Sequence, residues 1–245
     1  MKVISWNILA DEFIEEKYYQ LIPIKFLDRN KRLKIIINRI KQENPDVLLL
    51  QEVMIKEYNI LKKLFKNFYI SNLNTINWKY LNEYGNKSES GNIILLRKTK
   101  FSNFEYILDE FCMVSCIYKN EKICFINIHL DDLSSITRYK QIYKIIHKTN
   151  KFNNIIIAGD FNEKYNKKSN MYKLFKKYGY KSSIINNDPT YFISKTQSID
   201  NIFYRNFDLK SSFVSNDCGK RTIENIICQM VDYGSDHFPI ISYFS

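Results

Sequence analysis

The 245-residue chain has few of the residues that build disulfide frameworks, zinc centres or linkers. Its five cysteines are odd in number and scattered, which is not the pattern of a disulfide-stabilised protein, and we expect Cys112, Cys116 and Cys124 to be buried thiols. Only three histidines are present, which argues against a zinc site of Cys/His spacing. With six glycines and no Pro/Gly/Ser-rich stretch, we expect residues 1–245 to form one domain.

Long hydrophobic runs are also absent. No apolar stretch approaches the roughly 20 residues that cross a bilayer, and Met1–Trp6 has neither the apolar region nor the cleavage site of a signal peptide. We expect a soluble intracellular protein, with the cytoplasm favoured, no membrane partner and a monomeric state. Apolar residues at 45% and charged residues at 26% exclude a disordered, collagenous or coiled-coil chain.

Negative charge is in short supply. Lys and Arg number 37 against 26 Asp and Glu, so the net charge is +11. A surplus of this size favours a polyanionic partner, either nucleic acid or an acidic membrane face.

Short apolar runs alternate with segments of helical periodicity, which predicts a mixed α/β fold. Helices are expected over Arg29–Glu43, Lys56–Phe65, Ile136–Lys148 and Met171–Tyr178. Strands are expected over Lys2–Trp6, Val47–Leu50, Asn92–Leu96, Met113–Tyr118, Lys122–Ile128, Asn154–Ala158, Ser198–Tyr204, Leu209–Val214 and Ile240–Phe244. The irregular stretches Asn72–Ser90 and Asp217–Gly234 are candidate substrate loops.

Polar side chains interrupt the apolar pattern at six predicted strands. Singly, each has an ordinary explanation, such as an exposed strand end, an Asx turn or a surface histidine. Asp200 is harder to explain in this way, because an acid inside an apolar strand is costly unless it is paired. If the strand ends meet at one sheet edge, they provide carboxylates for Mg²⁺, amides for phosphate oxygens and a histidine for proton transfer. The six groups are Trp6-Asn7, Gln51-Glu52, Asn127-x-His129, Gly159-Asp160-Phe161-Asn162, Ser198-x-Asp200 and Ser235-Asp236-His237.

In this order, the six groups resemble those of the endonuclease/exonuclease/phosphatase superfamily, and they extend over essentially the whole chain. The resemblance implies an α/β fold that is a four-layer sandwich, in which two packed mixed β-sheets are flanked by helices and carry the site at one edge. It also implies Mg²⁺ as the cofactor, with Mn²⁺ as the alternative.

The resemblance further implies a role for each residue. Glu52 would be the principal metal ligand, with Asn7 beside it and Asp236 assisting. Asp160 would orient or deprotonate the attacking water, and Asn162 would fix the nucleophile and a phosphate oxygen. His237, held in its tautomer by Asp200, would face the phosphate, and His129 would contact the phosphate or the leaving oxygen.

Within the superfamily, the N-terminal run Trp6–Asp11 and the motif Ser235–Pro239 are similar to the deadenylase group that includes nocturnin and Angel. The segment Asp217-Cys218-Gly219 is similar instead to the tyrosyl-DNA phosphodiesterase branch. Histidine at position 129 fits both of these branches, whereas apurinic endonucleases usually carry tyrosine there.

Basic and aromatic residues suggest where a nucleic acid would lie. Trp78 is expected to stack on unpaired bases, as are Tyr80, Tyr84 and Tyr191. Lys62, Lys63 and Lys66 are read as a solvated helix face. A second lysine group follows the Asp160/Asn162 loop and is expected to hold the phosphate backbone. It comprises Lys164, Lys167, Lys168, Lys173, Lys176 and Lys177.

We therefore expect a Mg²⁺-dependent phosphodiesterase that acts on nucleic acid, as a deadenylase-like 3′-exoribonuclease on single-stranded RNA. The alternatives are a 5′-tyrosyl-DNA phosphodiesterase or other DNA-repair nuclease, and a phosphatase or phosphodiesterase of a small or lipid phosphate. A lipid substrate would require an exposed apolar loop, for which Asn72–Ser90 is too polar. An inactive scaffold would have lost site residues, and the eight residues assigned a role above are all present.

Overall fold

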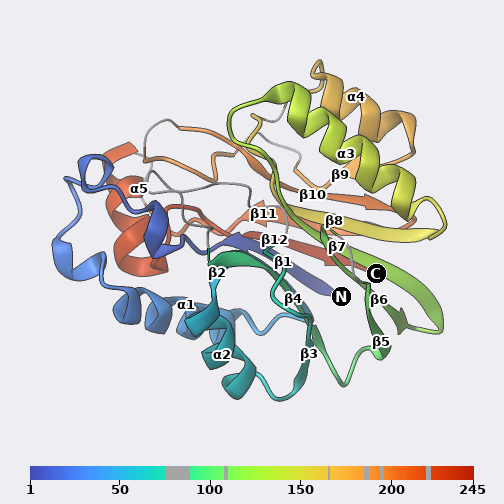
Figure 1. Cartoon of the computed structure of the whole chain (residues 1–245), viewed down its shortest axis with the longest axis horizontal. Coiled ribbons are helices and arrows are strands. Elements are labelled where there is room, and N and C mark those ends of the chain that lie inside the picture. The colour runs from blue at the N-terminus through green and yellow to red at the C-terminus, as the bar shows by residue number, and fades with distance from the viewer. Residues whose placement is uncertain (76–88, 108–109, 165, 185–187, 194–195, 219–221) are drawn as a thin grey trace.

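In the computed structural model, two six-stranded mixed sheets face each other, and helices cover the outer face of each sheet (Figure 1). The predicted four-layer α/β sandwich is therefore confirmed. The structure describes residues 1–245 except 76–88, 108–109, 165, 185–187, 194–195 and 219–221.

The strands of each sheet come from distant parts of the chain. The first sheet has the order β11 (Leu209–Val214), β12 (Ile240–Phe244), β1 (Lys2–Asn7), β2 (Val47–Met54), β4 (Ser90–Arg97) and β3 (Phe68–Ile70). The second has the order β5 (Ser102–Ile107), β6 (Cys112–Tyr118), β7 (Glu121–His129), β8 (Asn154–Asp160), β10 (Asp200–Arg205) and β9 (Lys181–Ser182). The helices α1 (Arg29–Glu43) and α2 (Ile55–Leu64) cover the first sheet, and α3 (Ser135–Thr149) and α4 (Asn170–Lys177) cover the second.

The central strands are apolar on both faces because both faces are buried. In β2, Leu48 and Leu50 pack against α1 and α2, whereas the alternate residues Val47 and Leu49 face the second sheet. Phe125 of β7 belongs to the same inter-sheet cluster. A strand buried on both sides reads as a continuous apolar run rather than an alternating one. For this reason the sequence predicts the central strands well.

Two predictions about the C-terminal region were wrong. The stretch Asp217–Gly234 contains α5 (Thr222–Cys228), which continues into the π-helical turn Gln229–Tyr233. Cys218 and Cys228 form a disulfide, with Cα atoms 6.1 Å apart, although no disulfide was expected. The two errors are connected, because α5, which was not expected from the sequence, ends at Cys228, ten residues after Cys218. Cys112, Cys116 and Cys124 are buried thiols, as predicted.

The sequence also missed three strands at or near the sheet edges. β3 and β9 are too short to show a period, and β5 is largely exposed, so it lacks an apolar run. None of the described helices is long and apolar enough to span a bilayer.

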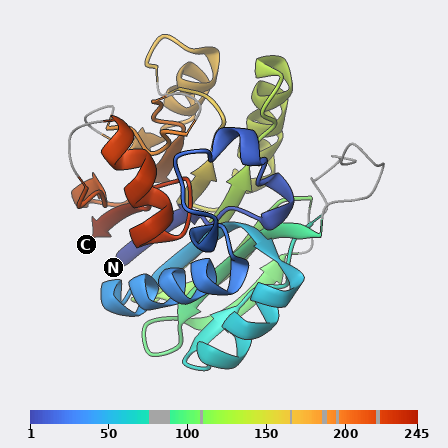
Figure 2. The ribbon, with the colours of Figure 1, turned by 90° about the vertical axis from the view of Figure 1, so that its left-hand side faces the viewer.

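One edge of the sandwich collects the ends of the central strands. Figure 2 looks onto this edge, where the N-terminal segment (blue) and α5 (red) lie in front of the sheets. The three short 3₁₀ turns Asp11–Phe13, Glu16–Tyr18 and Ile24–Phe26 connect β1 to α1 here. The chain termini lie together elsewhere, where the Phe244 amide donates to the Met1 carbonyl at 2.9 Å.

Candidate active site

Strand register aligns three of the predicted site residues. Asp160, the last residue of β8, pairs with His129 of parallel β7 on one side and with Asp200 of antiparallel β10 on the other. Directly paired residues project from the same face of a sheet. The three side chains therefore lie next to one another at one edge of the second sheet.

Gly159 permits this close arrangement. Its φ is +144°, and a Cβ atom there would lie 1.8 Å from the backbone oxygen of Ile128. Only glycine accommodates such a close approach of two backbones. The strands β7 and β8 can therefore meet at the position that places His129 beside Asp160.

Glu52 reaches the site from a bulge in the first sheet. The register between β2 and β4 shifts between Leu50 and Val53, and Glu52 has a left-handed backbone with φ of 59°. Leu9 and Asn162 are also left-handed, with φ of 57° and 49°. Such conformations are unfavourable for residues other than glycine and cluster at functional sites. At Glu52, the bulge turns the carboxylate away from the core and into the site.

Asn7 links the carboxylates of the two sheets. Its Nδ2 atom donates to Oε1 of Glu52 at 2.7 Å and to Oδ2 of Asp160 at 3.2 Å. The Ala10 amide donates to the second oxygen of Glu52 at 2.8 Å, and the Leu9 amide donates to Oδ1 of Asn7 at 3.0 Å. Both Glu52 oxygens are therefore fixed in position, one by the last residue of β1 and the other by the segment that follows it.

His237 is held by a buried carboxylate. Its Nδ1 atom donates to Oδ2 of Asp200 at 2.8 Å, which leaves Nε2 at 3.7 Å from Oδ2 of Asp160 and 3.9 Å from Oδ1 of Asp236. The Trp6 indole donates to the His237 carbonyl at 2.9 Å. These contacts set both the tautomer and the orientation of the imidazole.

Asn162 and His129 complete the group around Asp160. The backbone amide of Asn162 donates to Oδ1 of Asp160 at 2.8 Å, and the side-chain Nδ2 of Asn162 donates to the Leu130 carbonyl at 2.9 Å. His129 lies between two carboxylates, with Nδ1 3.8 Å from Oε1 of Glu52 and Nε2 3.7 Å from Oδ2 of Asp160. All eight residues assigned a role from the sequence are thus brought to one site.

The site holds four buried carboxylates, those of Glu52, Asp160, Asp200 and Asp236. Among the described residues, the only basic side chains with a nitrogen within 4.0 Å of these carboxylates are the two histidines, and no Lys or Arg lies so close. Burial, reinforced by Asp236, raises the pKa of Glu52 to about 8. Burial, reinforced by Asp200, raises the pKa of Asp160 to about 7.

The two histidines have opposite shifts. Burial, and then the neighbouring His237, lowers the pKa of His129 to about 3, so His129 is neutral. Burial also acts to lower the pKa of His237, but the carboxylates of Asp200, Asp236 and Asp160 outweigh it and raise this pKa well above its ordinary value. The site therefore contains one imidazolium and one neutral imidazole.

A hard divalent cation fits this donor set. Four buried carboxylates face a single imidazolium, and uncompensated buried charge is costly. Carboxylate oxygens are the ligands that Mg²⁺ and Mn²⁺ prefer. Two groups of donors are available: the predicted set of Glu52, Asn7 and Asp236, and a set from Asp160, Asp200 and His237 whose donor atoms all lie within 4.8 Å of one another.

Sequence reasoning missed Tyr19. This buried residue follows the second 3₁₀ turn, and its hydroxyl donates to Oδ2 of Asp236 at 3.0 Å. Burial, followed by the charge of Asp236, raises its pKa well above the ordinary value. No periodic signal marks Tyr19, because the surrounding segment consists of short 3₁₀ turns and irregular chain, although Tyr19 packs in an apolar cluster with Leu9, Ile22 and Met230. Tyr191, expected only to stack on bases, lies with its ring 5.0 Å from that of His237.

The predicted substrate-contacting residues are only partly placed. Trp78 lies outside the described residues, as do Tyr80 and Tyr84. Lys164, Lys167 and Lys168 are exposed on the loop between β8 and α4. None of the three takes part in the hydrogen bonds described above for the site.

Solved structures share this fold over the whole chain. The catalytic domain of human Nocturnin is 18% identical, with a TM-score of 0.69, and the match covers 100% of this chain and 94% of that one. ANGEL2, described as a 2′,3′-cyclic phosphatase, is 18% identical, with a TM-score of 0.72 and coverage of 99% and 94%. A humanized TDP2 from D. rerio is 18% identical, with a TM-score of 0.66 and coverage of 100% and 98%.

These similarities establish the fold. No curated protein matches the sequence. The profile of the Endonuclease/Exonuclease/phosphatase family matches residues 4–237, which include every site residue from Asn7 to His237. The chain therefore belongs to the endonuclease/exonuclease/phosphatase family, whose fold is that of phosphodiesterases and phosphatases.

Proposed function

We propose that the protein is a Mg²⁺-dependent phosphodiesterase that shortens single-stranded RNA from its 3′ end, with Mn²⁺ as the alternative cation. The observation that carries the proposal is the convergence of the His237–Asp200 pair, Asp160 and Glu52 at one edge of the sandwich. Phosphoryl displacement depends mainly on positioning and charge stabilisation, and these groups supply both. The net charge of +11 supports a nucleic acid as the substrate.

In this proposal, Asp160 accepts the proton of the attacking water. Burial and the neighbouring Asp200 raise the pKa of Asp160 in the metal-free chain, which makes it a stronger base than an ordinary aspartate. The Asn162 backbone amide holds Oδ1 of Asp160 at 2.8 Å, and Oδ2, which accepts one hydrogen bond from Asn7, keeps a second lone pair for the nucleophile. One N–H of the Asn162 side chain binds the Leu130 carbonyl, so the other can bind a phosphate oxygen.

The two histidines act on the phosphate in different ways. The His237 imidazolium places positive charge beside the phosphate, and Asp200 keeps its Nδ1 occupied so that Nε2 faces the substrate. His129 is neutral and contacts the phosphate or the leaving oxygen as a hydrogen-bond partner. We assign Glu52 and Asp236 to the cation, and Asn7 to the positioning of Glu52. When bound, the cation neutralises charge on the phosphate oxygens.

A cleavage assay with a panel of substrates tests this proposal. Wild-type protein, Glu52→Gln and the exposed control Glu16→Ala are compared in Mg²⁺ and in EDTA. The substrates are 5′-labelled oligo(A), mixed-sequence RNA, RNA with a 2′,3′-cyclic phosphate end, 5′-phosphotyrosyl DNA and a phosphoinositide. A ladder that shortens from the 3′ end, lost in EDTA and in Glu52→Gln but kept in Glu16→Ala, is the expected result.

Other outcomes would assign the site to the alternative substrates. Release of tyrosine from intact DNA would favour adduct repair, and removal of the cyclic phosphate alone would favour an RNA-end phosphatase. Absence of turnover on every nucleic acid would refute the substrate proposal and leave the fold unaffected.

A further inference from the structure

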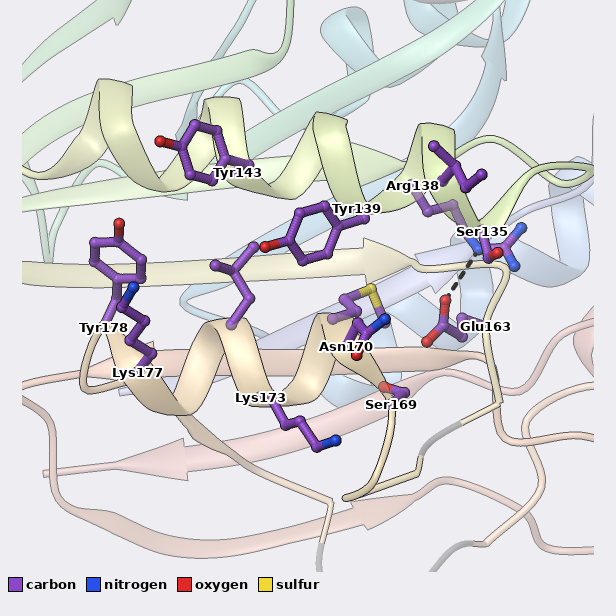
Figure 3. A pocket seen from close by; sticks show the side chains of 13 residues that line it. Ser135, Arg138, Tyr139, Tyr143, Glu163, Ser169, Asn170, Lys173, Lys177 and Tyr178 are labelled. Carbon is purple, nitrogen blue, oxygen red and sulfur yellow. Dashed lines mark hydrogen bonds and ion pairs between the residues drawn. The ribbon is translucent and has the colours of Figure 1, made fainter.

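A second cavity lies outside the catalytic edge. It is a groove between α3 and α4 on the outer face of the second sheet, with a volume of about 630 Å³ (Figure 3). Its floor is apolar and includes Met171 and Leu174, which belong to the core beneath the helices. We call it the α3/α4 groove.

Aromatic rings form one wall of the α3/α4 groove. Tyr139 and Tyr143 project from α3, and their exposed fractions are 37% and 46%. The Tyr143 ring lies 4.2 Å from the His147 ring, which in turn lies 5.7 Å from the ring of Tyr178 at the end of α4. Exposed rings along a surface groove are the usual platforms on which unpaired bases stack.

Positive charge accompanies these rings. The helices α3 and α4 contain seven basic residues and no acidic residue. They are Arg138, Lys140, Lys144, Lys148, Lys173, Lys176 and Lys177.

These charges are neutralised unevenly. Glu110 forms ion pairs with Lys144 and Lys148, whereas no described carboxylate forms one with Lys173 or Lys177, which line the groove. The groove therefore combines flat rings with uncompensated positive charge, which is complementary to bases joined by phosphates.

The α3/α4 groove begins close to the catalytic residues. At its inner end, Arg138 forms an ion pair with Glu163 at 3.3 Å (Figure 3) and donates to the Asp131 carbonyl at 2.9 Å. Glu163 directly follows Asn162, whose side chain donates to the Leu130 carbonyl next to Asp131. Glu163, which lines the groove, is thus the direct neighbour in sequence of Asn162, to which the proposed function assigns a phosphate oxygen.

We infer that the α3/α4 groove binds a single-stranded segment of the nucleic-acid substrate, at a distance from the bond that is cleaved. Bases would stack on Tyr139 and Tyr143, and phosphates would lie on Lys173 and Lys177. This inference rests on the proposed function, since it extends the same substrate beyond the catalytic site. It predicts that long strands bind more tightly than short ones.

Binding in EDTA tests the inference without turnover. Fluorescence anisotropy would compare labelled single-stranded RNA of about 4 and about 16 nucleotides, a span typical of single-strand binding sites. The variants are Lys173→Ala/Lys177→Ala, which changes two exposed side chains and should leave the melting temperature unchanged, and Tyr139→Leu/Tyr143→Leu, which removes the flat rings and keeps apolar side chains at these half-buried positions. The control is Lys62→Ala/Lys63→Ala, two exposed lysines on α2 in the opposite outer layer.

For the long strand, each groove variant should weaken binding by about tenfold, in line with the loss of one or two stacked bases or phosphate contacts. The slope of log affinity against log salt should fall by about 1.4 in the lysine variant, at about 0.7 for each phosphate contact with a single strand. Binding of the short strand should not change. The α2 control should bind both strands as the wild type does.

Unchanged long-strand binding in both groove variants would overturn the inference. So would displacement of the labelled long strand by polyglutamate as effectively as by unlabelled RNA, because polyglutamate has negative charge but no bases. Glu52→Gln separates this failure from failure of the proposed function, because it should lose cleavage and keep long-strand binding. If the wild type cleaves RNA while the groove variants bind it normally, only the groove inference is wrong. If the groove binds RNA that the wild type never cleaves, only the catalytic proposal is wrong.

Discussion

The Nδ1 atom of His237 lies 2.8 Å from Oδ2 of Asp200, and both side chains are buried. The Asp200 backbone N–H donates to Oγ1 of Thr190 at 3.3 Å, which fixes the backbone of the aspartate. The imidazole is thus fixed by a residue that need not touch the substrate. Asp200 is therefore a positioning residue in the proposed mechanism, and His237 is the group that faces the phosphate.

Removal of either member of this pair should disable the same unit. We expect His237→Ala to lower kcat/KM on oligo(A) by about 10²–10⁴-fold, the usual contribution of an acid–base group. Asp200→Asn should act through the same imidazole, so the double variant should be little worse than His237→Ala alone. Single-turnover rates of the three variants would measure this coupling. If the rate losses of the two single variants multiplied in the double variant, Asp200 would act independently of His237.

The pH profile distinguishes positioning from a merely structural role. Without the Asp200 carboxylate, the pKa of His237 should fall, since that carboxylate is the main group that raises it. The alkaline limb of the rate profile of Asp200→Asn should therefore shift to lower pH. An unchanged profile with a reduced rate would indicate that Asp200 only supports the fold.

Tyr19 should tune the cation site through Asp236. Its hydroxyl donates to Oδ2 of Asp236 at 3.0 Å, and Tyr19→Phe removes that donor while keeping the buried ring. Partners of metal-ligating carboxylates typically contribute 10–100-fold to metal affinity, so we expect the half-saturating Mg²⁺ concentration to rise by about tenfold. A Mg²⁺ titration of activity measures this. Tyr18→Phe, on the exposed neighbour, is the matched control and should behave as the wild type.

Much of the candidate site was predictable because its residues lie where apolar runs end. Asn7, Asp160 and His129 each terminate a strand that is buried on both faces, and such strands are visible as continuous apolar runs. Asp200 stood out because it was charged within an apolar segment. The fold class followed from the same pattern of short apolar runs and helical periodicity.

Other features depend on tertiary structure that a sequence pattern does not encode. The sequence Val47–Met54 does not predict the bulge that directs Glu52 into the site, because the register of β2 depends on its pairing with the neighbouring strand β4. Tyr19 follows a short 3₁₀ turn and is buried among apolar residues, in a segment too irregular to show a period. The burial of Arg32 was not predicted, although its spacing from Ile36 and Ile40 places it on the apolar face of α1.

Arg32 should be essential for stability rather than for chemistry. It is 1% exposed, and its Nη1 atom donates to the carbonyls of Ile8, Leu9 and Gly234, while Nη2 pairs with Asp11. Arg32→Leu would leave several buried acceptors without a donor, and we expect it to lower the unfolding free energy by about 3–5 kcal/mol. Urea unfolding measures this loss. Lys34→Ala, exposed on the same helix, should change it by less than about 0.5 kcal/mol.

The carboxylates of the site should make the metal-free protein less stable as the pH rises. The pKa of Glu52 is raised from 4.5 to about 8, so between these values the folded chain keeps a proton that the unfolded chain has lost. The unfolding free energy must then fall with increasing pH, by at most about 1.4 kcal/mol per pH unit for one proton. The pKa of Asp160 is raised to about 7, so below pH 7 this group adds to the fall in the unfolding free energy. His129 acts oppositely, but only below its ordinary pKa of 6.5.

Urea unfolding in EDTA between about pH 6.5 and about pH 8 therefore avoids the opposing effect of His129. The raised pKa of His237 acts in this range in the same direction as the acidic groups, so the comparison with Glu52→Gln identifies the part that Glu52 contributes. We expect stability to decline across this range, and Glu52→Gln, which cannot ionise, to decline less steeply. Added Mg²⁺ should restore more stability at the alkaline end, because a cation that binds carboxylates competes with protons. Stability that rises with pH in EDTA would contradict the upward shift at Glu52. A Mg²⁺ effect of equal size at both ends of the range would argue against Glu52 as a ligand, since its proton would then not compete with the cation.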